Sequence, residues 1–289
     1  MINFMFISCF VFLLLSKAQG DDSFEFLMFA QQYPTSMCLV QDETGSKTCV
    51  VPKQANAWTV HGLWPSRYAD EGPQFCHNPG RKFDHNKIQP IEDVLLQKWP
   101  NILPGQGEDS LWKHEWEKHG SCAEALPELG GELKYFQRSI GFHDQFDVFK
   151  TLNAAGITPS ADKAYSNARI IEVLGPMVAN NTIITHCVKD TDNDKWYIAS
   201  IRLCIDKTFS PIKCGRQMEE DWEEDWRMNL EGKLPTLRDC PDGDIYYPPS
   251  DQTDRTIVAY QDVPRTVDAW EWLFQLTPIG YIWHSVTHS

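Results

Sequence analysis

The sequence predicts an α+β fold: a single domain with a central antiparallel β-sheet, packed helices and disulfide bonds. Helix-like patterns cluster in the middle of the chain and strand-like patterns lie on either side, an order typical of α+β domains. The 289 residues are 42% hydrophobic, which allows one domain with a sizeable core. Of the nine cysteines, Cys9 lies in the N-terminal apolar run, so an even number remains for disulfide bonds.

Helices and strands are predicted from the period of their apolar residues. Residues 57–66, AWTVHGLWPS, begin with alternating apolar positions, so we predict a strand that runs into a loop near His61. Residues 87–102 have apolar positions at helical spacing that stop at Pro100. The other predicted elements are a helix over 109–120 that ends at Gly120, two helices over 135–160 with a break near Gly141, and strands over 181–190 and 195–206.

Residues 1–20 are predicted to be a signal peptide. An apolar run that begins at Phe4 is followed by Ala18 and Gly20, small residues of the kind that precede a cleavage site. The run is too short and wrongly flanked for a transmembrane helix, and a signal anchor is the alternative. We therefore expect a secreted protein or one of the lysosomal or endolysosomal lumen. Asn180, in the sequon NNT, is a candidate glycosylation site.

The rest of the chain is interpreted as a folded domain over 21–249 and a C-terminal extension over 250–289 of unknown role. The extension is aromatic and apolar, but Glu271 and Pro278 interrupt it, so neither a lipid-anchor signal nor a membrane anchor is predicted. An acidic segment over 216–232 is interpreted as a solvated amphipathic helix or surface insertion, with a partner-binding helix as the alternative.

The charge balance limits the partners of the protein. The net charge is -14 and the sequence pI is about 5.0. Phosphate neutralisation needs lysine and arginine, so a stable complex with nucleic acid is disfavoured. A nuclease is not excluded, because it needs a local site and fast release.

The stretch DSLWKHEWEKHGSC at 109–122 raises the question of a metal site. A helical zinc-protease motif has two histidines four residues apart, whereas His114 and His119 are five apart. At about 100° per residue their side chains would point about 140° apart on an α-helix, which does not suit one ion. We predict neither a metal nor a cofactor.

The same residues suit acid–base chemistry on a phosphate. On an α-helix His114, Glu115, Lys118 and His119 form one polar arc, with two tryptophans beyond its edge. A carboxylate beside an imidazole can orient it, and a lysine can bind a developing oxyanion. His61 supplies a second imidazole, and it is followed by Trp64 and Tyr68, aromatic residues that suit single-stranded nucleic acid. RNA cleavage needs such an acid–base pair.

The stretches HGLWPS and KHEWEKHGSC strongly resemble the two active-site motifs of the ribonuclease T2 family, the secreted and lysosomal acid ribonucleases. FDHNKIQPIEDVLLQKWPN, FDVFKTLNAAGITPS and LRDCPDGDIYYPP resemble other segments of animal members, so the similarity covers roughly residues 35–249. The resemblance implies an α+β fold and a metal-free endoribonuclease that acts on single-stranded RNA. Its products would be 2′,3′-cyclic phosphate ends and then 3′-phosphate ends. We expect a monomer.

The resemblance also implies a role for each motif residue. His119 would be the base and His61 the acid in the first step, with the roles reversed in the second. His114 would contact the phosphate, and Glu115 and Lys118 would stabilise the pentacovalent transition state. Trp64 would stack on the base. Ser66 stands where some relatives have an acidic base-reading residue, and Tyr68 is a second candidate base contact. The family pattern further implies the disulfide pairs Cys38–Cys49, Cys76–Cys122, Cys187–Cys240 and Cys204–Cys214.

Two other functions compete with this one. The protein could be a secreted glycoprotein that acts mainly by binding a partner, with ribonuclease activity incidental. A metalloprotease would instead be inhibited by a chelator. Because free histidine titrates near pH ~6.5, the ribonuclease hypothesis predicts greatest activity at mildly acidic pH.

Overall fold

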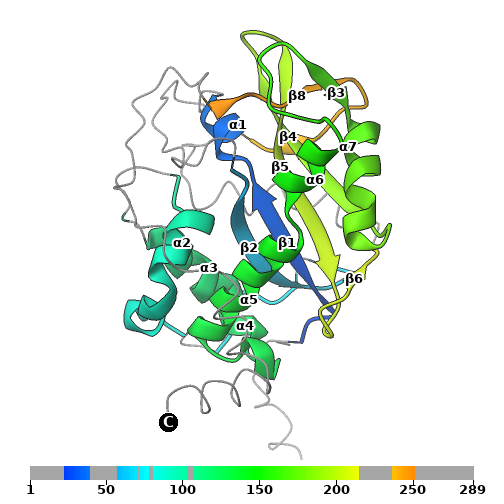
Figure 1. Ribbon diagram of the computed structural model, residues 1–289. Helices are drawn as coiled ribbons and strands as arrows, with labels where there is room; N and C mark the ends of the chain where they lie inside the picture. The colour runs from blue at the N-terminus through cyan, green and yellow to red at the C-terminus, as the bar shows by residue number, and fades with distance from the viewer. Residues whose placement is uncertain are drawn as a thin grey trace, which may run out of the picture.

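The computed structural model of the chain describes residues 23–39, 57–70, 72–77, 81–102, 107, 109–214 and 236–250 (Figure 1). The predicted signal peptide, the acidic segment over 216–232, Cys49 and the extension beyond Ser250 lie outside these residues. Within them, no helix is both long and apolar enough to cross a membrane.

The sheet has the strand order β2-β1-β5-β4-β7, and each neighbouring pair in this order is antiparallel. Strand β2 therefore lies at one end of this order, which leaves one of its sides open to a helix. Shorter strands extend the sheet, and β8 runs parallel to β5, which is the departure from the antiparallel prediction. The strands are β1 (Phe26–Gln32), β2 (Thr59–Ser66), β3 (Ala164–Ser166), β4 (Ile183–Asp190), β5 (Lys195–Ile205), β6 (Pro211–Ile212), β7 (Arg238–Asp239) and β8 (Asp244–Tyr246).

The helices lie mostly between β2 and β4 in the chain, as the α+β prediction requires (Figure 1). They are α1 (Pro34–Leu39), α2 (Glu92–Lys98), α3 (Ser110–Glu115), α4 (Ser121–Ala123), α5 (Glu132–Gln145), α6 (Val148–Ala154) and α7 (Asn167–Leu174). Short 3₁₀ turns are η1 (His85–Lys87), η2 (Gln89–Ile91), η4 (Pro127–Leu129) and η5 (Gly175–Val178), and η3 (Trp116–Gly120) is a π-helical turn.

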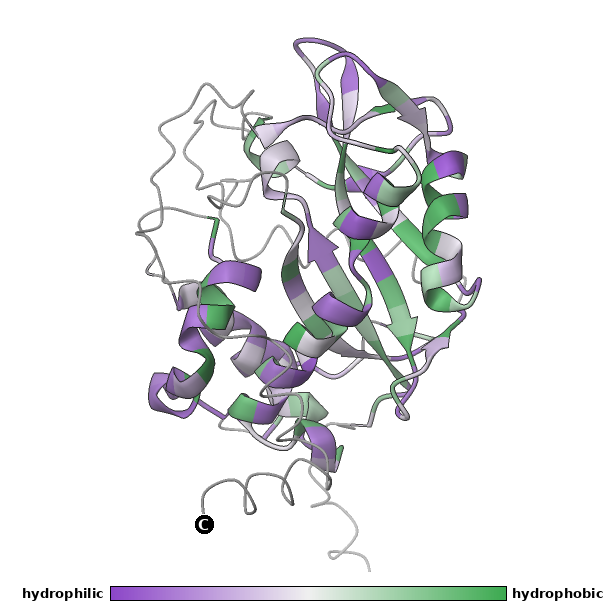
Figure 2. Cartoon of the chain, in the orientation of Figure 1, coloured by the Kyte–Doolittle hydropathy of each residue, from purple (hydrophilic) through white to green (hydrophobic). Residues whose placement is uncertain are grey.

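The main core lies between the helices and one face of the sheet. Trp99, Trp112, Trp116, Tyr135 and Phe29 are all fully buried there. Burial of each large apolar side chain contributes roughly 1.5–3 kcal/mol. Figure 2 shows hydrophobic and hydrophilic residues on different parts of the same helices, as expected when one side of a helix is buried.

A smaller apolar cluster occupies the opposite face of the sheet. Its members are Phe26, Met28, Ala30, Trp64, Ile184 and Cys204. The sheet is thus buried on both faces. Strand β1 was not predicted, because all seven of its residues are buried and FLMFAQQ does not alternate between apolar and polar residues.

The helix boundaries differ from prediction at two glycines. Helix α5 continues through Gly141, and the break comes at Phe146 and Asp147, whose side chain accepts a hydrogen bond from the amide of Lys150 to begin α6. The helical segment that begins with α3 also continues past Gly120 into α4. A glycine costs a helix only about 1 kcal/mol, so packing of the neighbouring turns decides these cases.

Candidate active site

His61 lies inside strand β2, not at its end. Ala30 pairs with Gly62 and Gln31 with Val60, so His61 is the extra residue of a β-bulge. A bulge re-aims the side chain that it carries. The indole N–H of Trp99 donates to the carbonyl of His61 at 2.9 Å, which fixes the backbone from the end of α2.

A π-helical turn positions the second motif. In η3 the amide of Ser121 donates to the carbonyl of Trp116, five residues earlier. Such turns are rare and often occur at functional sites. A π turn rotates less per residue than an α turn, so the His119 side chain points closer to the direction of His114 than it would on an α-helix. The centroids of the two rings are 6.2 Å apart. The α-helical arc predicted from the sequence is therefore narrower in the structure.

The two motifs meet beside β2. Glu115 Oε1 lies 3.8 Å from Nε2 of His61, and Glu115 Oε2 accepts a 2.8 Å hydrogen bond from the Trp64 indole. The Trp64 ring centroid is 5.1 Å from that of His61 and 5.6 Å from that of His119. The structure therefore brings His61, His119 and Glu115 together around one indole ring.

Gly62 makes this approach possible. A Cβ at Gly62 would collide with Glu115 Oε2 and Trp64 Nε1, and would lie 2.7 Å from Cε2 of Trp64. The Glu115 carboxylate and the indole thus close directly over the glycine backbone. The residue is required here by space and not by its φ angle.

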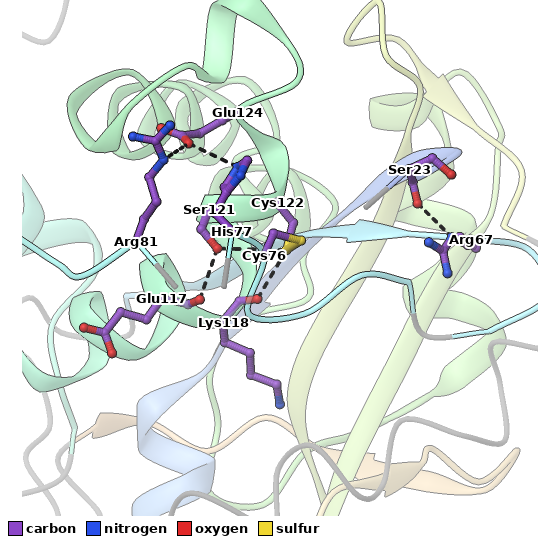
Figure 3. The surroundings of a disulfide bond; sticks show 10 residues. All are labelled: Ser23, Arg67, Cys76, His77, Arg81, Glu117, Lys118, Ser121, Cys122 and Glu124. Carbon is purple, nitrogen blue, oxygen red and sulfur yellow. Dashed lines mark hydrogen bonds and ion pairs between the residues drawn. A yellow bond between two sulfur atoms is a disulfide. The ribbon is translucent and has the colours of Figure 1, made fainter. Parts of the chain in front are cut away.

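The disulfide Cys76–Cys122 holds the end of the second motif (Figure 3). The amide of Phe75 donates to the carbonyl of Lys118 at 2.9 Å, so the loop after β2 is joined once to the π-helical turn and once to α4. Figure 3 shows the Lys118 side chain extending away from the disulfide. Lys118 itself is 1% exposed.

Comparison with known proteins identifies this arrangement. A model of the ribonuclease T2 family matches residues 24–214. The chain belongs to the ribonuclease T2 family. Ribonuclease T2 protein rnst-2 of Caenorhabditis elegans is 32% identical over 246 residues, covering 83% of this chain and 87% of that protein. Extracellular ribonuclease LE of Solanum lycopersicum is 29% identical over 218 residues, covering 71% and 90% of the two chains.

Solved structures agree. The crystal structure of RNase NT in complex with 5′-AMP matches with a TM-score of 0.62 at 27% identity, covering 78% of this chain and 99% of that one. The predicted fold class and family are confirmed, and the chain is an endoribonuclease of the T2 type.

Three predicted disulfides are confirmed: Cys76–Cys122, Cys187–Cys240 and Cys204–Cys214. The predicted pair Cys38–Cys49 lies partly outside the described residues, because Cys49 is not among them.

Loss of the Cys76–Cys122 bond is expected to affect stability and activity together in this T2 ribonuclease. The bond joins residues 46 apart, so Cys76→Ser with Cys122→Ser should lower the free energy of unfolding by about 4 kcal/mol. The control pair, Cys204→Ser with Cys214→Ser, opens a separation of 10 residues and should lower it by about 3 kcal/mol. Denaturant unfolding measures both. Activity per folded molecule should fall in the first variant alone, and equal activities would show that this bond does not position the second motif.

Burial dominates the electrostatics of the site. It raises the pKa of Glu115 to about 8, although the Trp64 hydrogen bond and the Lys118 charge oppose the rise. Burial and then Lys118 lower the pKa of His114 to about 4. Glu115 thus keeps its proton at acidic pH, where it can donate a hydrogen bond.

Both members of the predicted acid–base pair share a lowered proton affinity. Burial holds the pKa of His61 well below its usual value, and Arg202, His114 and Lys118 lower it further. Burial likewise lowers the pKa of His119, with Lys118, His114 and His61 adding to the effect. An anionic phosphate placed among these groups would raise both values.

Of the three predicted base contacts, Trp64 and Ser66 are buried and Tyr68 is exposed. Trp64 is 2% exposed and hydrogen-bonded to Glu115, so it lacks the open face that stacking on a base needs. Ser66 is fully buried, and its hydroxyl donates to the carbonyl of Trp64. Tyr68 is 42% exposed and packs on Phe26 with ring centroids 4.8 Å apart, so it can reach a base.

Sequence reasoning missed Gly62, Trp99 and Arg202. Arg202 had a visible signal, because it is a charged residue inside the apolar run IASIRLCI of β5. Gly62 and Trp99 had none beyond their positions in or near a motif. Within the described ranges, no three histidine, cysteine, aspartate or glutamate side chains are grouped so that they could hold a metal ion.

Proposed function

We propose that this endoribonuclease cleaves single-stranded RNA in two metal-free steps, through 2′,3′-cyclic phosphate to 3′-phosphate ends, at acidic pH in RNA catabolism. The convergence of His61 with His119 and Glu115 around Trp64 carries the proposal. Two imidazoles on different elements can flank one phosphate, which is the arrangement that an in-line displacement needs.

In the first step His119 takes the proton of the 2′-hydroxyl, and the 2′-oxygen attacks phosphorus. The bond from phosphorus to the 5′-oxygen breaks as His61 gives its proton to that oxygen. In the second step His61 takes a proton from water, and the water oxygen attacks phosphorus of the cyclic phosphate. The bond from phosphorus to the 2′-oxygen breaks as His119 returns a proton to that oxygen. No proton or charge is left over, and both residues regain their starting states.

Lys118, Glu115 and His114 are assigned to the transition state. The buried ammonium of Lys118 acts through a low dielectric, where it stabilises negative charge on the equatorial oxygens better than it would in water. Glu115 donates a hydrogen bond from its protonated carboxyl group. His114, on the turn before His119, contacts the phosphate. Tyr68 is proposed as the base contact.

We also propose that the protein is exported as a monomer, secreted or in the lysosomal lumen, after removal of residues 1–20. The even cysteine number after Cys9 and the name of the extracellular tomato relative support export. Asn180 is exposed in the turn after η5, where a glycan would have room. N-terminal sequencing and glycosidase treatment of the protein recovered from culture medium would test this, and an N-terminus at Met1 would contradict it.

The pH dependence follows from the two imidazoles. We expect a bell-shaped profile of kcat/KM with its maximum below pH ~6.5. The first step needs His119 neutral and His61 protonated, and lowered pKa values mean that His61 gains its proton only in acid. Above that range the leaving oxygen finds no proton and the rate falls. Rates measured from pH 4 to 9 on a short single-stranded RNA check this, and a flat profile or a maximum above neutrality would contradict it.

The deciding experiment is digestion of a defined RNA at pH 5 in EDTA, with the new ends identified. Cyclic phosphate ends should appear first and 3′-phosphate ends later, at a rate equal to that without EDTA. The appearance of 5′-phosphate ends, or loss of cleavage in the chelator, would overturn the mechanism.

A further inference from the structure

Arg202 is a buried cation on the sheet face that carries Trp64. It lies in β5, opposite Ala30 of β1, and Ala30 lies opposite Gly62 of β2. The row from Arg202 to β2 therefore contains two small residues. Strands lie about 4.8 Å apart, so the arginine side chain can cross above Ala30 toward the active site. The residue is 3% exposed.

The guanidinium reaches the indole ring that joins the two motifs. Its Cζ lies 5.3 Å from the centroid of the Trp64 ring, within the range of a cation–π interaction. The same indole donates to Glu115 and lies beside His61. A chain of contacts thus runs from Arg202 through Trp64 to Glu115.

We propose that Arg202 is a positioning residue for RNA cleavage, which holds Trp64, and through it Glu115, in place beside His61. The proposal rests on the proposed function, because it assumes that His61 and His119 carry the reaction. An arginine suits this role better than a lysine, since its planar guanidinium stacks on an aromatic face and stays charged when buried.

The charge of Arg202 acts on the same site. The titratable and charged groups that face His61 are Glu115 and His114 of α3, Lys118 and His119 of η3, and Arg202 of β5. After burial, the guanidinium is the largest influence that lowers the pKa of His61.

Two titratable groups face Arg202 from the other side. Nε2 of His186 in β4 lies 3.5 Å from Oδ1 of Asp239 in β7. The charge of Arg202 lowers the pKa of His186, and the charge of Asp239 favours the protonated form of Arg202. Burial lowers the pKa of Arg202 to about 10, and Asp239 opposes this shift. The guanidinium is therefore charged throughout the range in which an acid ribonuclease works.

The test compares Arg202→Met with Arg202→Lys. Methionine removes the charge and the stacking plane, so kcat should fall roughly 10- to 100-fold through misplacement of Glu115, with KM changed less. Loss of a positive charge favours the protonated form of His61, so the basic limb of the pH profile should move up by roughly half a pH unit or more. Lysine keeps the charge, so the basic limb of the pH profile of that variant should stay at the wild-type pH. Its kcat should still be reduced, because lysine lacks the planar group that stacks on Trp64.

Arg169→Met is the matched control. Arg169 lies on the exposed side of α7 and pairs with Glu172, and both kcat and the limb should equal those of the wild type. Unfolding curves establish that each variant is folded. If the methionine variant does not fold, the lysine variant decides, because wild-type kcat there would show that the stacked guanidinium is not needed.

The outcomes separate this proposal from the proposed function. A methionine variant with wild-type kcat, or with reduced kcat and an unmoved limb, overturns the positioning role and leaves the acid–base assignment intact. Full activity of a His119→Phe variant would overturn the proposed function itself, whatever Arg202 does.

Discussion

Replacing His61 or His119 with phenylalanine is expected to lower kcat/KM for single-stranded RNA by roughly 10²- to 10⁴-fold. Each variant removes a proton donor or acceptor but keeps a ring of similar volume in a buried position, so the fold should survive. Both imidazoles act in one step. The double variant should therefore be about as slow as the slower single variant, because residues that act as a unit have non-additive effects.

His85→Phe is the control for this pair. His85 is a half-exposed histidine that pairs with Glu92 and Asp109, and surface ion pairs contribute about 0–1 kcal/mol. Its activity should stay near that of the wild type. Rates are measured on a fluorescent oligonucleotide at the pH optimum of each variant. If His119→Phe keeps a tenth or more of the wild-type rate, another group is the base.

The two residues exchange roles in the second step. With a 2′,3′-cyclic nucleotide as substrate, His61 acts as the base that activates water and His119 as the acid. Both variants should therefore fail to hydrolyse it. A His61→Phe variant that hydrolyses the cyclic phosphate at the wild-type rate would limit His61 to the first step.

Much of the fold and of the site was predictable because short-range patterns carry it. The strand around His61, the helical segment from Ser110 and the hairpin of β4 and β5 follow from periodicity and turn residues. The family motifs contain the residues that the structure brings together. Three of the implied disulfide pairs are confirmed because each joins elements that the fold places side by side.

What could not be predicted depends on contacts between distant segments. The bulge at His61 arises because the pairing of β1 with β2 shifts by one residue at this position. The sequence of one strand does not determine its register with a partner strand. The π-helical turn at Trp116–Gly120 is likewise stabilised by packing: a Cβ at Gly120 would lie 2.6 Å from the Trp116 ring and 3.0 Å from Tyr135. The α-helical wheel therefore placed His114 and His119 too far apart.

The burial of Trp64 is the clearest example. From the motif alone an aromatic residue beside a catalytic histidine suggests a stacking surface for a base. The structure instead surrounds it with His61 of its own strand, Glu115 and His119 of the second motif, and Arg202 of β5. A side chain whose neighbours come from two strands and a helical segment cannot be assigned a surface role from its sequence neighbours.

Gly62→Ala is expected to have the second-largest effect, although it adds one methyl group. The new Cβ would occupy the space of Glu115 Oε2 and of the Trp64 indole nitrogen, so one or both side chains must move. A shift of about 1 Å at a catalytic group can lower the rate about 10²-fold, and we expect kcat/KM to fall by at least that factor. Overpacking of a buried site should also lower the free energy of unfolding by roughly 1–3 kcal/mol.

The matched control is Gly141→Ala in helix α5. A Cβ there meets nothing within 4 Å, and alanine favours a helix interior over glycine, so stability should rise by roughly 0.5–1 kcal/mol with unchanged activity. Both variants are measured for kcat/KM and for denaturant unfolding. If Gly62→Ala cleaves RNA within threefold of the wild type, the hydrogen bond between Trp64 and Glu115 is not needed for the reaction. In that case Glu115 would have to act from a position away from Gly62, and the role assigned to the indole would be lost with it.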